Sequence, residues 1–138
     1  YVVCQVEGRA GECACEGAWL MGISTQAIAV KLLGDALGVR VSTRMPDPEP
    51  KQFVIVSRIG GGADTWSTKA PRFLVECYAP SEVVAEKLAD DAWDAWREFR
   101  SNQVTWASVD NNLTRYDDPD SRFSRFQFTA QLQLKRTQ

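Results

Sequence analysis

The chain has 138 residues, 44% of them hydrophobic and 25% charged, with a formal net charge of −2 from 16 basic and 18 acidic side chains. This balance is typical of a globular domain, so it excludes the disordered class and provides no positive field for nucleic acid or an anionic membrane. The sequence contains no histidine, which removes the usual general base, the usual partner of a Ser or Cys nucleophile and the commonest metal ligand.

The first twenty residues are interpreted as an N-terminal extension or irregular arm, because they are rich in Gly, Glu and Cys without helical or strand periodicity. We expect residues 21–138 to form a single domain. We expect neither a signal peptide nor a transmembrane helix, since no apolar run approaches about 20 residues. The four cysteines are too few and too unevenly placed for a disulfide framework, which favours synthesis in a reducing cytosol.

The first helix is predicted over residues 25–37, where apolar side chains recur at helical spacing. Ser24 or Thr25 can cap its N-terminus, and Gly38 suits the left-handed position just after its end. A strand follows over residues 39–44.

Three prolines between residues 45 and 50 then exclude helix and remove backbone donors, which predicts an extended, exposed loop. Residues 53–59 and 72–78 are predicted to form a hairpin, with Gly60-Gly61-Gly62 in a long, flexible connection.

A second helix is predicted over residues 82–100, capped by Ser81, and a strand over 104–109 follows it. From Phe126 the alternation is strict, so that one face of the last strand is buried and the other is wet. We therefore predict an α+β fold, in which a mostly antiparallel sheet of about five strands carries two helices on one face, in the order α-β-β-β-α-β-β.

No motif predicts a catalytic site, a cofactor or a metal. Carboxylates at every fourth position of the second helix form an acidic row that we interpret as a solvated face, or else as an electrostatic contact surface. The glycine run lacks the pattern of a phosphate-binding loop. The gap in Cys13-Ala14-Cys15 is too short for the usual zinc pair, and Cys77 is predicted to be a core residue. The five tryptophans favour core or protein-interface packing over stacking on nucleic-acid bases.

Several segments resemble the tail terminator proteins of long-tailed, siphovirus-type phages that infect actinobacteria. The resemblance covers about Gly22 to Lys135 and is carried by LGVRVSTRMPDP (37–48), FVIVSRIGG (53–61), PRFLVECYA (71–79), DDP (117–119) and FQFT (126–129). It implies a structural virion protein and no enzyme. Such a subunit forms a hexameric ring on the tail tube, stops tube polymerisation and provides the head–tail joining surface.

The implied partners are further copies of the chain, the tail tube protein and a head–tail connector or stopper protein. The implied location is the head-proximal end of the virion tail, after assembly in the host cytoplasm and without a membrane. Genomic DNA would pass through the bore without specific binding. The neutral face of Gln127, Thr129, Gln131 and Gln133 suits such a bore, because amides without positive charge do not hold phosphates.

The exposed loops at 45–51, 60–68 and 111–121 are long enough to reach neighbouring subunits or rings. These loops, together with Lys69 just after the second of them, contain the residues hypothesised to contact a subunit or partner: Asp47, Glu49, Gly61, Trp66, Lys69, Arg115, Asp117 and Asp118. Two alternative functions remain open. One is a head–tail connector adaptor or stopper, which would differ only in its partner, and the other is a small enzyme that works without histidine.

Overall fold

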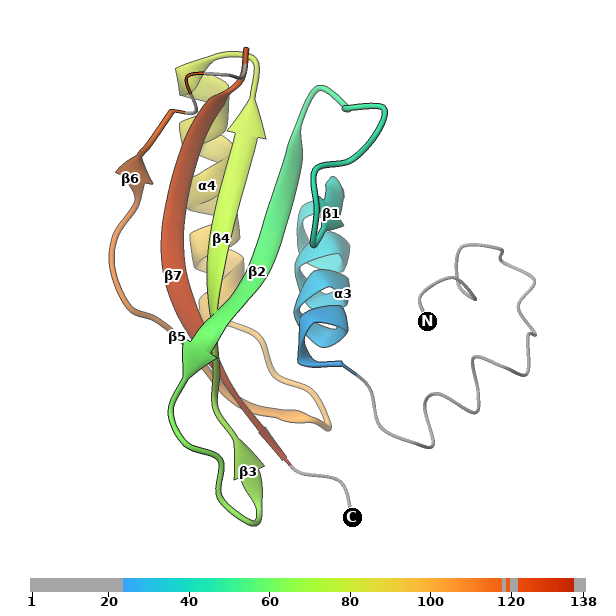
Figure 1. Cartoon of the computed structure of the whole chain (residues 1–138), viewed down its shortest axis with the longest axis vertical. Helices are drawn as coiled ribbons and strands as arrows, with labels where there is room; N and C mark the ends of the chain where they lie inside the picture. Colours follow the sequence, from blue (N-terminus) through green and yellow to red (C-terminus); the bar gives the residue numbers. More distant parts are fainter. Residues whose placement is uncertain (1–23, 118, 120–121, 136–138) are drawn as a thin grey trace, which may run out of the picture.

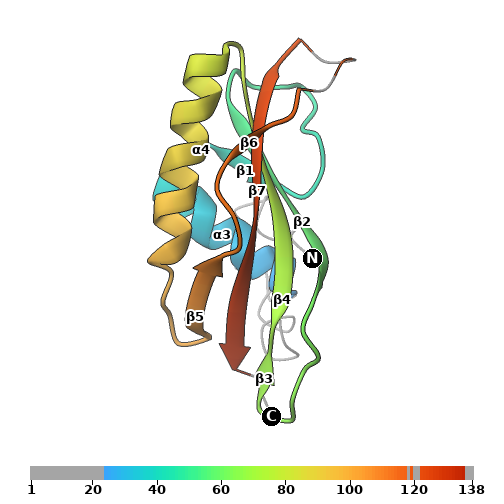
Figure 2. The same cartoon turned by 90° about the vertical axis from the view of Figure 1, so that its left-hand side faces the viewer.

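The computed structural model of the chain describes residues 24–117, 119 and 122–135. Within them, two helices and seven strands succeed one another as α3 (Thr25–Leu37), β1 (Arg40–Ser42), β2 (Phe53–Gly61), β3 (Thr68–Lys69), β4 (Pro71–Ala79), α4 (Glu82–Arg97), β5 (Val104–Val109), β6 (Thr114–Arg115) and β7 (Ser124–Lys135). Helices α3 and α4 lie on the same side of the sheet (Figures 1 and 2), so neither of them covers its opposite face.

The sheet is mixed, with the order β1-β2-β4-β7 and with β3, β5 and β6 also paired to β7. β1 runs parallel to β2, whereas the other pairs are antiparallel. The prediction of an α+β fold with two helices on one face agrees with this architecture. The predicted count of about five strands and their order were wrong, because β3 and β6 have two residues each and are too short to show a periodicity.

The ends of the elements follow local hydrogen bonds. The Oγ of Ser24 accepts from the backbone N–H of Gln26 and Ala27, which begins α3 as predicted, and Gly38 ends it at a φ of 71°. The strand predicted over 39–44 is only three residues long. The helix predicted to reach Arg100 ends at Arg97, because the next N–H groups bond in a tight turn instead of continuing the helix.

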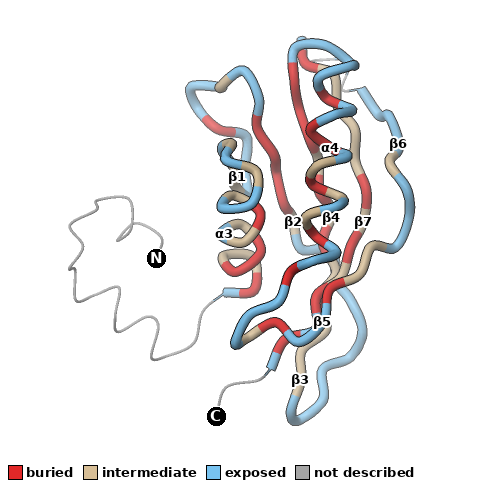
Figure 3. Tube along the Cα trace, turned by 180° about the vertical axis from the view of Figure 1, so that it is seen from behind, coloured by how far each residue is buried: buried red, intermediate tan, exposed pale blue. Residues whose placement is uncertain are grey.

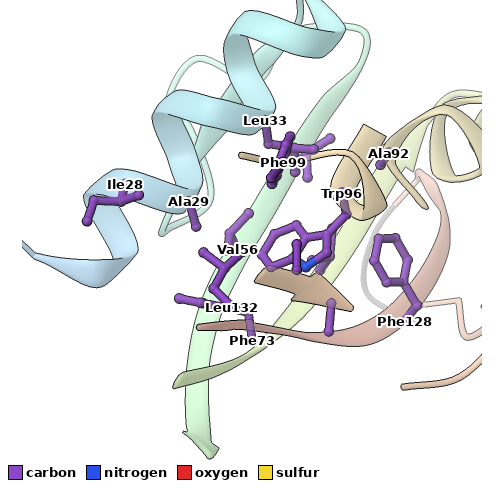
Figure 4. Packing of buried hydrophobic residues seen from close by; sticks show 14 of the residues in the cluster. Ile28, Ala29, Leu33, Val56, Phe73, Ala92, Trp96, Phe99, Phe128 and Leu132 are labelled. Carbon is purple, nitrogen blue, oxygen red and sulfur yellow. The ribbon is translucent and has the colours of Figure 1, made fainter. Parts of the chain in front are cut away.

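The core lies between the helices and the sheet, and Trp96 of α4 is at its centre (Figure 4). This side chain is fully buried, with its ring 5.6 Å from that of Phe73 and 5.3 Å from that of Phe99. Its Nε1 donates to the backbone oxygen of Gln131 at 3.1 Å, so the one polar atom of the indole is satisfied. Figure 3 shows the same division, with buried residues along the facing sides of both helices and the strands.

The opposite face of the sheet has a smaller cluster, made by Phe53, Ile55, Tyr78 and Phe123. Phe53 and Tyr78 are direct partners across β2 and β4, and their rings stack with centroids 4.8 Å apart. Alternation along β2 separates this cluster from the main core, since Val54 and Val56 point to the helices. The cluster therefore anchors the segments at one end of the outer face.

Candidate assembly interface

The residues hypothesised as contacts lie in three separate regions of the surface. The proline-rich loop contains Asp47 and Glu49. Residues 60–70, called the arm below, contain Gly61, Trp66 and Lys69. Strand β6 with the segment after it contains Arg115 and Asp117. Asp118 lies outside the described residues. The loop and the arm are at opposite ends of the molecule (Figure 1), so a single copy does not combine them into one site.

The arm is a hairpin whose two sides are joined by hydrogen bonds. The N–H of Gly62 donates to the carbonyl of Ala70 at 3.1 Å, and the N–H of Thr65 donates to the carbonyl of Thr68 at 2.9 Å. The Oγ1 of Thr65 also accepts from two backbone N–H groups at the tip. These bonds hold Trp66 outward with 83% of its surface exposed.

Gly61 supports the arm through its backbone. Its φ is 132°, a region that side chains rarely adopt. A Cβ at this position would lie 2.1 Å from the backbone oxygen of Ala70. The glycine therefore permits the close approach of the two sides of the arm, and nothing in its surroundings requires a partner molecule.

Arg115 and Asp117 lie next to each other and tie β6 to its neighbours. The guanidinium is 2.9 Å from Asp117 through Nη2 and also forms an ion pair with Glu82, in the first turn of α4. Asp117 accepts a further hydrogen bond from the backbone N–H of Arg125 at 3.2 Å. The hydrogen bond from Arg115, followed by that from Arg125, lowers the pKa of the Asp117 carboxyl.

The outer face of the sheet agrees with the alternation predicted for β7. Phe128, Ala130, Leu132 and Leu134 are buried, while the residues between them point away from the core. The face also contains two arginines, one from β4 and one from β7, and each forms an ion pair with a carboxylate. The alternation of β7 does not predict these pairs, because their partners lie on other segments. Arg72 lies 2.8 Å from Asp110, and Arg125 lies 3.1 Å from Glu76, so the face combines amides with balanced charge.

Two exposed aromatic residues were missed among the hypothesised contacts, Trp106 on β5 and Tyr116 just after β6. They are 56% and 59% exposed. A register shift between Val104 and Trp106 turns the indole out of the core. Strict alternation from Val104 would have buried it, and the sequence carries no signal for the bulge. Each ring is covered on one face by an arginine, Arg100 over Trp106 and Arg125 over Tyr116.

The acidic row of α4 is solvent-facing, as predicted. Its members are all exposed: Glu82, Glu86, Asp90, Asp94 and Glu98. Val84 in the first turn of the helix is 38% exposed, and the buried side of the helix begins at Ala85.

A polar hollow of about 580 Å³ lies at the start of α3, between this helix and the arm. Arg58 and Lys69 line it with the first residues of α3, and Arg58 Nη1 donates to Thr25 Oγ1 at 3.2 Å. Ser24 is already used as the cap of the helix. Ser24, Thr25, Gln26 and Arg58 therefore have partners within the chain, and nothing else in the hollow indicates a ligand.

Catalytic and metal chemistry find little support in the described part of the chain. Among those residues no group of three or more Cys, Asp or Glu side chains is close enough to hold a metal ion. Cys77 is buried in β4, and burial, with a smaller contribution from Glu76, raises the pKa of its thiol. This is the reverse of the environment that activates a cysteine nucleophile.

Neither α3 nor α4 is long and apolar enough to cross a bilayer.

Comparison with known proteins gives matches among solved structures. No protein-family model matches the chain, and no curated protein sequence matches it either. Among solved structures, the fold is similar to that of a chain in the virion of a native gene transfer agent particle, with a TM-score of 0.54 at 15% sequence identity. The match covers 91% of this chain and 100% of that chain. The likeness defines a shared α+β fold, and the function requires a separate argument.

Proposed function

We propose that the chain is a structural protein of a phage-like virion, and that within the virion it is the tail terminator. In this role copies form a ring, which we take to be hexameric, on the last ring of the tail tube. The ring stops tube polymerisation and offers a joining surface for the head connector. The observation that carries the proposal is the shared fold, which spans the whole of a chain from a virion particle.

The sequence resemblance to tail terminators supports the finer assignment, because three of its five segments coincide with neighbouring strands. Residues 53–61 are β2, residues 71–79 are β4, and 126–129 lie within β7. These three strands are adjacent in the sheet. Three of the five segments therefore lie at the centre of the sheet.

The outer face of the sheet suits the wall of a bore. Neither α3 nor α4 covers it (Figure 2), and its arginines at 72 and 125 are paired with carboxylates. Since binding to DNA depends on neutralising phosphates with unpaired cations, such a face gives DNA little to hold. Rings that expose this face inward would let DNA slide without specific binding.

The partner that the chain binds tests the proposal. The full chain is purified and its mass measured by light scattering behind a sizing column, alone and with the tail tube protein of the same virion. We expect a stable complex with tube protein, and a ring-sized mass for the chain in that complex. A chain that ignores tube protein but binds the portal would instead be a connector adaptor or stopper, and a chain that binds neither would contradict the proposal.

A further inference from the structure

The tip of the arm presents an aromatic side chain in a form suited to binding. Trp66 is the most exposed large hydrophobic residue in the described part of the chain, at 83%. The hydrogen bonds around Thr65 fix the backbone that carries it. An exposed indole on ordered backbone loses little conformational freedom when it is buried by a partner, and tryptophan is among the residues that dominate binding energy at interfaces.

The other end of the molecule has a hollow whose walls match an indole. Its volume is about 130 Å³, and it is lined by Glu49, Pro50, Lys51, Pro80, Arg122 and Phe123. The two prolines and the phenylalanine supply apolar surface. The guanidinium of Arg122 lies 4.9 Å from the centre of the Phe123 ring, so a cation is already held where it can also face a second aromatic ring.

The size of the hollow identifies the kind of occupant. Sites for small-molecule ligands usually measure about 300–1,000 Å³, whereas this hollow holds about 130 Å³. It therefore has room for one side chain and not for a cofactor. Apolar walls with a cation at the rim favour an aromatic side chain over an aliphatic or acidic one.

We infer that Trp66 of one copy of the chain occupies the hollow between Pro50, Pro80 and Phe123 of the next copy. The arm lies at one end of the longest axis, and the β1–β2 loop and the β4–α4 turn, which help to line the hollow, lie at the other (Figures 1 and 2). One molecule therefore cannot fill its own hollow with its own Trp66. Both halves of the contact are present in a single chain, which is what a head-to-tail contact between identical copies requires. Such a contact closes into a ring when its rotation permits.

The closure of this contact into a ring rests on the proposed function. The contact between Trp66 and the hollow of the next copy does not. Two variants separate the two ends of the contact. Trp66→Ala removes the anchor, and Pro80→Arg places a long side chain at the wall of the hollow. Lys51→Trp is a second way to block the hollow, because Lys51 is exposed on another wall. Trp106→Ala is the matched control, since it removes an exposed indole outside the contact.

The masses of the full-length variants are measured by light scattering and sedimentation, with circular dichroism as the test of folding. We expect wild-type protein and Trp106→Ala to assemble, and Trp66→Ala to weaken self-association by about thirtyfold or more, the loss of one strong interface anchor. The two variants with a blocked hollow, Pro80→Arg and Lys51→Trp, should each remain monomeric. An equimolar mixture of Trp66→Ala with a blocked variant should form a dimer and nothing larger, because only one intact contact is left.

Assembly of Trp66→Ala at wild-type concentrations would overturn the inference, as would a mixture in which both folded variants stay monomeric. A wild-type chain that is monomeric at millimolar concentration would also overturn it. These outcomes are independent of binding to tube protein. The proposed function is contradicted if the chain does not bind tail tube protein, whether or not Trp66 joins the copies of the chain.

Discussion

At the scale of single residues, the hypothesised contacts divide into those that serve the fold and those that are free to meet a partner. Arg115 and Asp117 bond to each other, and both are tied to other elements through Glu82 and Arg125. Trp66 instead has most of its surface in solvent. Charge in a loop therefore does not by itself predict an interface, because an exposed charge often has a neighbour within the chain.

The carboxyl of Asp117 is predicted to titrate below its ordinary value of about 3.9. Its pKa is lowered chiefly by the hydrogen bond from Arg115, so the ionised form is favoured in the folded chain. Because the pKa is lower in the folded chain than in the unfolded chain, ionisation of Asp117 favours folding. Asp117 stabilises the fold above about pH 4, and this contribution is lost as the pH falls through the folded pKa. Carbon-detected NMR titration of the carboxyl group measures the pKa directly.

Arg115→Gln should return the pKa of Asp117 toward its ordinary value, while Arg122→Gln is the control that removes a guanidinium elsewhere. Arg122 lies near Glu49, at 3.7 Å, and has no contact with Asp117. Equal titration of Asp117 in all three proteins would mean that the pair with Arg115 does not form in solution.

At the scale of elements, the long helices and strands were predictable, whereas the short ones were not. Helix α3 was predicted with its true bounds, since Ser24, an apolar period and Gly38 all act locally. Strand β5 was also predicted with its true bounds, yet its bulge was not, and Trp106 is exposed as a result. Bulges, two-residue strands and the parallel pairing of β1 depend on contacts between distant segments, which one sequence read locally does not contain.

The arm gives the prediction at this scale. Gly61→Ala should lower the free energy of unfolding by about 2 kcal/mol, because the new side chain meets both a disfavoured φ and the backbone of Ala70. Gly62→Ala is the matched control. Its Cβ would lie 3.9 Å from that of Ala70, in ordinary contact, so its effect should stay within about 0.5 kcal/mol. Urea unfolding of both variants makes the comparison, and equal stabilities would show that the arm tolerates a side chain at residue 61.

At the scale of the whole molecule, α3 and α4 cover one face of the sheet, and neither helix covers the other face. One end of the molecule carries an exposed indole, that of Trp66, and the other end carries a hollow with room for one side chain. The sequence predicted the wet face and the exposed loops. It did not predict the hollow, because residues 49–51, 80 and 122–123 come together only when the sheet forms. A subunit with two unlike ends and a charge-balanced face is consistent with a ring around a bore.

Tube length is the measurement that tests termination most directly. Tail tube protein is polymerised alone and with substoichiometric full-length chain, and the tubes are measured by electron microscopy with the chain labelled. The account predicts shorter tubes in proportion to the amount of chain, with label at one end of each tube. Unchanged tube lengths, or label along the sides of the tubes, would contradict the claim that this protein terminates a tail.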